Sequence, residues 1–312
     1  MEEELNYLHY TLDKYDEVIE DSKLKLNNLV KLYPNDSEKR LEEKFRLQGE
    51  INSIEKAKNT PYFARIDFKS DDKLDKCYIG KLGVSDYDNN IITVDWRAPI
   101  SSIYYDSNIG ACSYEAPEGI INGELLLKRQ YAIKNKELIN YNDVDTVSND
   151  ELLKPYLNVS ANNRLKNIVS TIQSEQNKII REKLGKNMII QGVAGSGKTT
   201  VALHRIAYLV YNNRELYKPS DYMVIGPNKF FVNYISGILP DLDVNGVSEY
   251  TLEEVFENYV DDDLEIASVR ENPSVLNEEI ISMLRDYKNT RCSNAPINFI
   301  TNSRFEDVFK KE

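Results

Sequence analysis

The sequence predicts an α/β P-loop domain, preceded by an antiparallel β domain and an N-terminal antiparallel helical hairpin. Three observations predict this fold class. A glycine-rich loop, Gly192–Thr199, stands between a short apolar run and an amphipathic stretch, as a phosphate-binding loop does between a strand and a helix. Residues 61–155 alternate short β-branched and aromatic runs with turn signals. Residues 1–59 carry apolar side chains at heptad spacing.

The composition narrows the class of protein. The chain has 312 residues, is 41% hydrophobic and carries a formal net charge of −12. It is long enough for globular domains with real cores, and it lacks the basic surplus of proteins that coat nucleic acid by charge alone. An acidic balance equally permits a basic protein partner. Because residues 1–10 have neither a basic segment nor an apolar core, we expect no signal peptide. No apolar run reaches the roughly 20 residues of a membrane span.

The cysteines give no sign of a metal site or a disulfide framework. They are odd in number and far apart: Cys77, Cys112 and Cys292. Isolated thiols of this kind suit a reducing compartment. We therefore expect a cytoplasmic protein that has no membrane contact, and we expect a monomer.

Residues 1–59 are predicted to form an arm of two antiparallel helices. A seam in the first helix repeats every three or four residues and is apolar except at Ser22: Leu5, Leu8, Leu12, Tyr15, Ile19, Ser22, Leu26 and Leu29. This is the a/d pattern of a coiled coil. Pro34 ends the helix, and residues 35–37 supply turn and N-cap chemistry for a second helix that ends before Pro61. Either the seam packs on the main body, or the hairpin projects and probes a partner.

Residues 60–155 are predicted to form a small antiparallel β domain. Runs such as YFARIDF, NIITVDWRAPISSIYYDS and GELLLKRQYAIKNKELINY are separated by turn signals such as SDYDNN and APEG. Trp96, the only tryptophan, stands beside Arg97. We expect Trp96 to anchor the core, with Arg97 in a structural role.

Residues 156–312 are predicted to form a partial P-loop domain. The expected order is a helix, a strand, the loop, a helix, a strand and a helix, at residues 163–184, 186–191, 192–199, 199–213, 221–228 and 228–242. Beyond Tyr250 the chain is expected to be helical and acidic.

The loop has the spacing of a Walker A motif. Its glycines allow a tight turn whose N–H groups face phosphate oxygens, and the following helix adds its positive N-terminal dipole. Lys198 brings a mobile positive charge to the β- and γ-phosphates, and the hydroxyl of Thr199 can bind Mg²⁺. We predict Lys198 and Thr199 as catalytic residues in a cradle formed by Gly192, Val193, Ala194, Gly195, Ser196, Gly197, Lys198, Thr199 and Thr200.

Gln176, in the run IQSEQNKII, lies upstream of the expected strand. A glutamine amide can pair with both N6 and N7 of adenine. A solvated helical glutamine is the ordinary alternative, but the position before a P-loop strand favours adenine recognition. The predicted cofactors are therefore ATP and Mg²⁺.

These runs, together with HRIAYLVY and VIGPNKFF, resemble the superfamily 1 helicases of the UvrD/PcrA/Rep type. The resemblance implies a RecA-like domain 1A for this part of the chain, with Gln176 as the residue that reads adenine. It puts Asn228 and Lys229 at motif Ia, where such enzymes contact nucleic acid. One departure is Thr200, because these helicases usually carry arginine directly after the threonine of the loop.

A second resemblance covers nearly the whole chain. The runs TPYFARIDF, YIGKLGV, VDWRAPISSIYY, GELLLKRQY and QGVAGSGKTTVALHRIAYLVY look like the HelD family of helicase-like ATPases that associate with bacterial RNA polymerase. The resemblance implies that the helical hairpin enters the secondary channel of the polymerase, and that the protein helps to strip the polymerase from nucleic acid and recycle it. Asp36 and Glu38, at the tip, then become candidates to bind the partner, although a solvated capping turn is the better explanation for each residue taken alone.

Hydrolysis in this class needs a Walker B acid pair and an arginine from a second core domain. The nearest acidic candidate, NYVDDDLE at residues 258–265, follows a run that reads as an amphipathic helix rather than a strand. We therefore expect this chain to be the N-terminal part of a longer protein, which binds ATP weakly and does not turn it over.

Alternatives to the HelD-like interpretation remain open. One is a 3′–5′ DNA helicase of the UvrD/helicase IV type that acts in repair. Another is a nucleotide-dependent interaction module without motor activity. A small-molecule kinase is disfavoured because the sequence offers no second acid and no lid.

Overall fold

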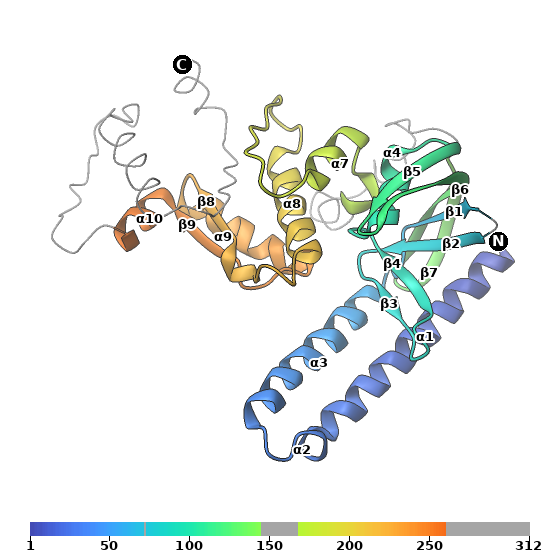
Figure 1. The fold of residues 1–312 in the computed structure, drawn as a ribbon, viewed down its shortest axis with the longest axis horizontal. Helices are drawn as coiled ribbons and strands as arrows, with labels where there is room; N and C mark the ends of the chain where they lie inside the picture. The colour runs from blue at the N-terminus through green and yellow to red at the C-terminus, as the bar shows by residue number, and fades with distance from the viewer. Residues whose placement is uncertain (72, 145–167, 260–312) are drawn as a thin grey trace. The chain divides into compact units, whose positions relative to one another are not determined.

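The computed structural model describes residues 1–71, 73–144 and 168–259 (Figure 1). The chain divides into two compact units, unit 1 from Met1 to Lys178 and unit 2 from Ile179 to Glu312. The predicted domain limits at residues 59 and 155 stay predictions. Most of the acidic candidate at 258–265, the start of the helix expected at 163–184, and Cys292 lie outside the described residues.

Unit 1 is built around a seven-stranded sheet in the order β3-β4-β2-β1-β6-β5, with β7 paired to β6. The strands are β1 Ala64–Ser70, β2 Lys73–Gly80, β3 Val84–Ser85, β4 Ile91–Asp95, β5 Gly110–Ala116, β6 Gly119–Lys134 and β7 Glu137–Asp143. Most neighbours are antiparallel, but β2 and β4 are parallel. The expectation of a purely antiparallel sheet is wrong because β3 turns the chain back before β4, which leaves β4 running in the direction of β2.

The run NIITVDWRAPISSIYYDS was expected to be extended, and it is a strand only over β4. It continues into a 3₁₀ turn at Pro99–Ser101 and the helix α4 at Ser102–Asp106. Proline suits the first position of a helical turn. The hydroxyls of Ser101 and Ser102 donate to the carbonyl oxygens of Asp95 and Pro99, at 2.7 and 2.8 Å, and these bonds favour the turn over an extended backbone.

The DWR sequence belongs to the core of unit 1. Trp96 is only 2% exposed, and Arg97 is equally buried. The Nε and Nη2 atoms of Arg97 bind the two carboxylate oxygens of Asp95 at 2.8 and 2.7 Å. Since a buried charge needs a partner, this fork satisfies the arginine inside the fold. The predicted core tryptophan and structural arginine are confirmed.

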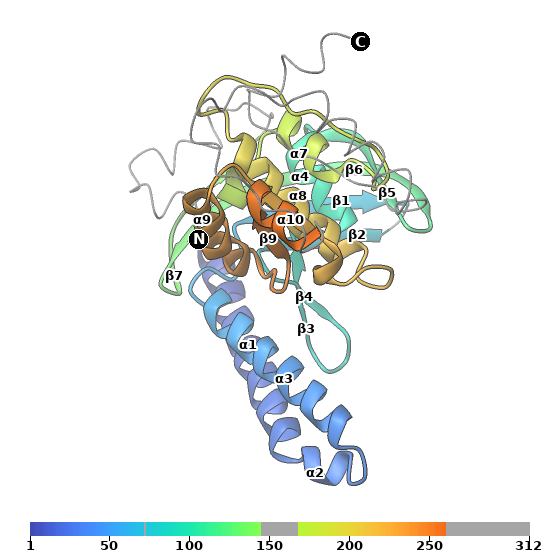
Figure 2. The same ribbon diagram turned by 90° about the vertical axis from the view of Figure 1, so that its left-hand side faces the viewer.

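The N-terminal hairpin consists of two long helices that lie side by side (Figures 1 and 2). Helix α1 spans Glu2–Asn27, the short helix α2 spans Leu29–Leu32, and α3 spans Ser37–Ala57. The chain reverses around Pro34, as predicted, and Asp36 caps α3 by accepting from the backbone N–H of Lys39 at 2.8 Å. We call residues 1–59 the arm.

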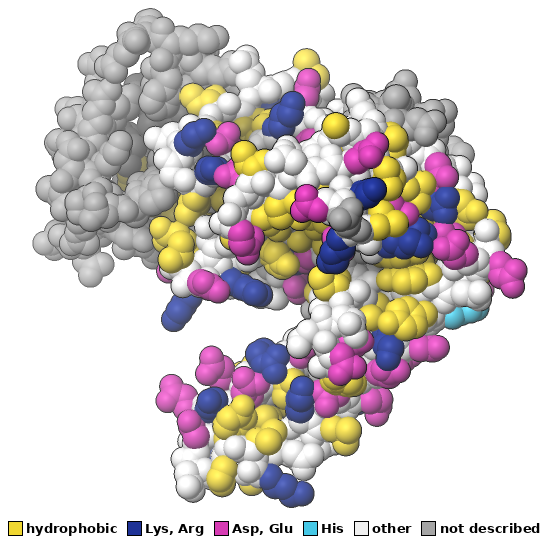
Figure 3. Space-filling model, turned by 45° about the vertical axis from the view of Figure 1, so that its right-hand side comes forward, with side chains coloured by type: hydrophobic (Ala, Val, Ile, Leu, Met, Phe, Trp, Pro, Cys, Tyr) yellow, Lys and Arg dark blue, Asp and Glu magenta, His cyan; other side chains and the backbone are white. Residues whose placement is uncertain are grey.

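The inner and outer parts of the arm differ in burial. The sequence pattern left open whether the arm packs on the main body or projects from it. The inner part packs on the β3–β4 hairpin in one apolar cluster: Tyr15, Val18, Ile19, Ile51, Ile54, Val84 and Ile92. The outer part keeps large apolar side chains in solvent, among charged ones (Figure 3): Leu24, Val30, Leu32, Leu41 and Phe45. The arm therefore packs at its base and is unpartnered towards its tip, within the described residues.

Unit 2 contains a small parallel sheet with helices around it. The elements are α8 Lys198–Asn212, a 3₁₀ turn Pro219–Asp221, β8 Met223–Gly226, α9 Lys229–Ile238, a 3₁₀ turn Leu239–Leu242, β9 Ser248–Thr251 and α10 Leu252–Tyr259. Strands β8 and β9 pair in parallel through the α9 crossover. The helix expected after the loop and the strand and helix that follow it are confirmed. Beyond Tyr250 the described residues form the expected helix, α10, whereas strand β9 just before it was not predicted.

Two other expectations for this region are wrong. Residues 186–191 are not a strand, although Ile189 and Ile190 have high β propensity. A strand needs a hydrogen-bonded neighbour, and β8 and β9 pair with each other instead. The single helix expected at 163–184 is also interrupted, because the described part is a 3₁₀ turn at Ile168–Thr171 followed by the helix α7 at Ser174–Arg181.

Candidate functional site

The glycine-rich loop contains two glycines in the left-handed conformation. Gly195 and Gly197 have φ angles of 82° and 81°, in the left-handed region that favours glycine. A Cβ atom on Gly192 would lie 2.7 Å from the Oγ atom of Ser196. Residues 191–196 are all exposed, and Val193 is 79% exposed. The loop is therefore open to solvent rather than filled by its own apolar side chains.

Lys198 folds back onto this loop. Its ammonium group donates to the carbonyl oxygens of Gly192 and Val193, at 2.8 and 3.0 Å. The backbone N–H of Ser196 donates to the same Val193 oxygen at 3.2 Å. Charged acceptors bind an ammonium group about twice as strongly as neutral ones. A bound phosphate would therefore compete with these carbonyl groups for Lys198.

The start of α8 follows the loop directly. Its N-cap residue is Gly197, and no side chain caps the first turn. Uncapped N–H groups and the helix dipole together attract an anion. Thr199 and Thr200 are half-buried in this turn. His204 is buried one turn further on, where Nδ1 carries the proton because it bonds to the carbonyl oxygen of Thr200 at 2.7 Å.

Sequence reasoning missed the role of Arg205, on the same helix. Its side chain is 2% exposed. Nη1 donates to three carbonyl oxygens, those of Ile179, Ile180 and Glu182, at 3.0, 3.2 and 2.6 Å. These carbonyls lie at the C-terminal end of α7 and just beyond it, where backbone oxygens lack helical partners. Arg205, on α8, thus caps the C-terminal end of α7. In the sequence, only the run HRIAYL pointed to this arginine.

Gln176 lies in unit 1, in the first turn of α7, and is half-buried. Its Oε1 atom accepts from the backbone N–H of Gln173 at 3.1 Å, which is the reach-back half of a capping box. The same turn is held by Asp106, whose carboxylate accepts from Ser174 Oγ at 3.1 Å and Asn177 Nδ2 at 2.6 Å. Gln176 therefore has a local structural bond, and its reading of adenine stays a prediction.

The motif Ia residues also have local partners. Asn228 caps α9, because its Oδ1 atom accepts from the backbone N–H of Phe231 at 2.9 Å. The ammonium group of Lys229 binds the carboxylate of Glu254, and this hydrogen bond lowers the pKa of Glu254. Phe230, beside them, is 86% exposed. A nucleic-acid role for Asn228 and Lys229 stays a prediction.

At the arm tip, one of the two predicted partner-binding residues, Asp36, is a helix cap. Asp36 is the N-cap of α3. Glu38 is exposed in the first turn of that helix, where a negative charge suits the dipole. Their proposed contact with a partner stays a prediction.

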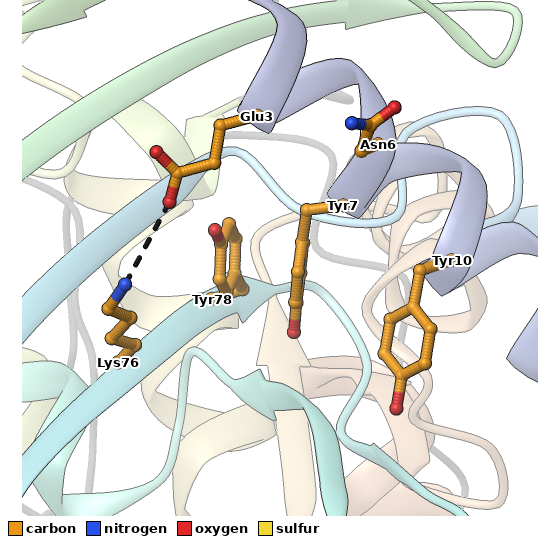
Figure 4. Close-up of a pocket in the computed structure, with 6 residues that line it drawn as sticks. All are labelled: Glu3, Asn6, Tyr7, Tyr10, Lys76 and Tyr78. Carbon is orange, nitrogen blue, oxygen red and sulfur yellow. Dashed lines mark ion pairs between the residues drawn. The ribbon is translucent and has the colours of Figure 1, made fainter.

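Two surface hollows lie in unit 1, and neither is lined by a residue of the glycine-rich loop at 192–199. One sits over the base of the arm, where the rings of Tyr7 and Tyr78 stack at 3.6 Å (Figure 4). The other lies in the outer arm, against Leu29 and Leu41. Among the described residues, no three side chains of the metal-ligating types come together. Within the same part of the chain, every helix is too short or too polar to traverse a lipid bilayer.

Comparison with known families agrees with this arrangement. Residues 1–152 match the N-terminal domain of DNA helicase IV HelD, and residues 172–226 match the N-terminal domain of UvrD/REP helicases. The first match covers the arm and the seven-stranded sheet, and the second covers Gln176, the loop, α8 and β8. A comparison with curated proteins gives no match. The chain is therefore HelD-like over residues 1–152 and UvrD/REP-like over residues 172–226.

Proposed function

We propose that this chain supplies the ATP-binding loop and the partner-binding arm of a HelD-like helicase-type motor. In this proposal the arm engages bacterial RNA polymerase, and the motor promotes release of the polymerase from nucleic acid. Unit 2 is then part of a RecA-like domain 1A, and its parallel β8–α9–β9 connection supports that assignment.

The observation that carries the nucleotide part is the geometry around Lys198. An ammonium group, the uncapped start of α8 and two left-handed glycines converge on one open loop. This set fits a triphosphate, because it supplies backbone donors, a dipole and a mobile charge. The phosphates would be held by the loop amides and Lys198, and Mg²⁺ by Thr199. We keep Gln176 as the residue that selects adenine.

The polymerase part is supported by the arm and by the HelD match over it. The outer arm carries Leu24, Leu41 and Phe45 in solvent beside charged side chains. Large exposed apolar groups of this kind mark protein-binding surfaces. Asp36 and Glu38 lie at the end of this surface, and we propose that they approach the partner first.

Two measurements test this function separately. Binding of a fluorescent ATP analogue with Mg²⁺ should be saturable, should be displaced by ATP and should be lost in Lys198→Ala. Capture of core RNA polymerase by the immobilised chain should be lost when Lys23 is joined to Arg46 by a short glycine linker. This deletion removes the outer arm and keeps the apolar cluster at its base. Capture that persists without the outer arm contradicts the arm's role.

A DNA helicase of the UvrD/helicase IV type is the second candidate. The UvrD/REP match and the highly exposed Phe230 beside Asn228 favour it, because exposed aromatic rings stack on unpaired bases. Salt-dependent binding of single-stranded DNA that Phe230→Ala weakens, together with absent polymerase capture, would support this alternative.

A further inference from the structure

A single buried carboxylate ties the arm to the sheet of unit 1. Glu4, in the first turn of α1, is 1% exposed. Its Oε1 atom accepts from Nη1 of Arg65 at 3.2 Å and from Nη1 of Arg129 at 2.5 Å. Its Oε2 atom accepts from the hydroxyl of Tyr131. Burial raises the pKa of Tyr131, and the bond to Glu4 raises it further, so this hydroxyl remains a donor.

The two arginines are aimed at Glu4 by the sheet. They stand directly opposite each other in the pairing of β1 with β6. Arg65 binds the carboxylate of Asp67 through Nε and Nη2, at 2.7 and 2.8 Å. Arg129 binds Asp143 in the same way, at 2.5 and 2.8 Å. Each fork leaves Nη1 to point at the arm, and Glu4 separates two like charges that would otherwise face one another.

Glu4 belongs to one of two groups of contacts that hold α1 on unit 1. In the same group Tyr7 stacks on Tyr78 at 3.6 Å, and Leu8 is buried with Tyr62 and Tyr131. The other group is the contact with the β3–β4 hairpin, where the hydroxyl of Tyr15 bonds to that of Thr93 at 2.7 Å and the hydroxyl of Tyr87 donates to the carbonyl of Glu17. Tyr15 follows Glu4 by about 17 Å along the helix axis, at 1.5 Å per residue. A rod held at two separate points has a fixed direction, whereas a rod held at one point can pivot.

We infer that Glu4 is the positioning residue that sets the direction of the arm. Helix α1 has 26 residues and is therefore about 39 Å long. A tilt of about 10° at its base would displace its far end by about 7 Å, which is more than the width of a side-chain contact. The fixed direction is a property of the chain itself. Its use to present the tip to polymerase rests on the proposed function.

Glu3 provides a matched control in the same turn. Its side chain is 74% exposed, and its carboxylate lies 3.8 Å from the ammonium group of Lys76 (Figure 4). It lies 3.9 Å from Arg65. Exposed pairs of this length contribute little to stability. Glu3→Gln and Glu4→Gln remove the same formal charge from neighbouring positions, but only the second disrupts the buried cluster.

The test measures the distance between spin labels on the arm and on the sheet. Labels are attached to cysteines at Glu38, in the tip, and Glu118, in the β5–β6 turn, after the three natural cysteines are replaced by serine. With Glu4 intact we expect one narrow distance distribution, and Glu3→Gln should retain it. Glu4→Gln should broaden it by at least 5 Å. Equal widths in the two variants overturn the inference.

A less disruptive variant, Tyr131→Phe, is used if Glu4→Gln fails to fold. Tyr131→Phe removes one of the three donors to Glu4 and keeps the ring that packs in the core. It should broaden the same distribution by a smaller amount, and an unchanged width in a folded Tyr131→Phe protein overturns the inference. Polymerase capture is measured in parallel on the same variants without labels and with the natural Glu38, Glu118 and cysteines. Absence of capture by the intact chain counts against the proposed function alone, because the label distances do not depend on polymerase.

Discussion

Lys198 and Gly192 are joined by a hydrogen bond of 2.8 Å, from the side-chain ammonium group to the backbone carbonyl six residues earlier. The bond closes the loop on itself and lies in an exposed part of the chain. Its partner is a neutral oxygen, so the lysine is held in place until a stronger acceptor arrives.

Lys198→Ala should therefore weaken nucleotide binding without weakening the fold. We expect the affinity for an ATP analogue to fall at least tenfold, or about 1.4 kcal/mol. Lys198 is half-buried, but its two hydrogen bonds go to carbonyl groups of the exposed loop residues Gly192 and Val193, so the urea midpoint should hold to within about 0.5 kcal/mol. Lys186→Ala, at an exposed position, is the control. Equal affinity in both variants would show that the loop is not the nucleotide site.

Gly192→Ala should damage the cradle by steric conflict. The added methyl group would lie 2.7 Å from Ser196 Oγ, so either the serine or the loop backbone must move. We expect at least a tenfold loss of ATP-analogue affinity. Adding Ser196→Gly removes the colliding atom and should recover most of that loss. Gly237→Ala, where nothing lies within 4 Å of the new methyl group, should bind like the parent. Failure of the double variant to recover would count against a steric cause.

Arg205→Met should destabilise unit 2. It leaves the carbonyl groups of Ile179, Ile180 and Glu182 without the donor that they share. The Ile179 oxygen keeps a bond from the backbone N–H of Glu182 at 3.4 Å, so the loss falls mainly on Ile180 and Glu182. Unsatisfied buried groups cost about 1–3 kcal/mol each, and we expect a total of about 3 kcal/mol. Hydrogen exchange of the α8 amides should accelerate roughly a hundredfold. Arg214→Met, at an exposed position, should leave exchange unchanged. A similar rate in both variants would mean that the arginine is dispensable to the fold.

Local chemistry predicted much of this fold. Pro34 and the heptad seam located the two arm helices, and the glycine spacing located the loop and α8. The parallel pairing of β2 with β4 was beyond reach, because it depends on the short strand β3 and on tertiary closure. Residues 186–191 had the propensity of a strand, but propensity cannot supply a hydrogen-bonded neighbour.

The charged cluster at Glu4 shows why parts of the functional architecture could not be predicted. A glutamate in the first turn of a helix is ordinarily a solvated group that complements the dipole. Its burial follows from Arg65 and Arg129 standing opposite each other, and strand register is not readable from a single sequence. The role of Arg205 could not be predicted either. Its partners are backbone carbonyl groups, which every residue has, so no side chain in the sequence marks them.

Lys128 should make the stability of unit 1 depend on pH. It is 1% exposed, and its ammonium group donates to the carbonyl of Ser107 at 2.5 Å. Burial lowers the pKa of Lys128 to about 8, although Asp106 and Cys112 act in the opposite direction. The unfolded side chain has a pKa of about 10.4. Between these values the unfolded chain binds more protons than the folded chain, so the free energy of unfolding rises with pH.

The expected gain from this lysine is about 3 kcal/mol across that window, at 1.36 kcal/mol per unit of pKa difference. Tyrosines also titrate near its upper end, so the measurement is the difference between the parent and Lys128→Met in urea unfolding from pH 7 to 9.5. The variant should be the more stable at pH 7, and the gap should narrow as the pH rises. Lys134→Met, exposed on the same strand, should track the parent throughout. A constant gap for Lys128→Met would show that the buried lysine keeps an ordinary proton affinity.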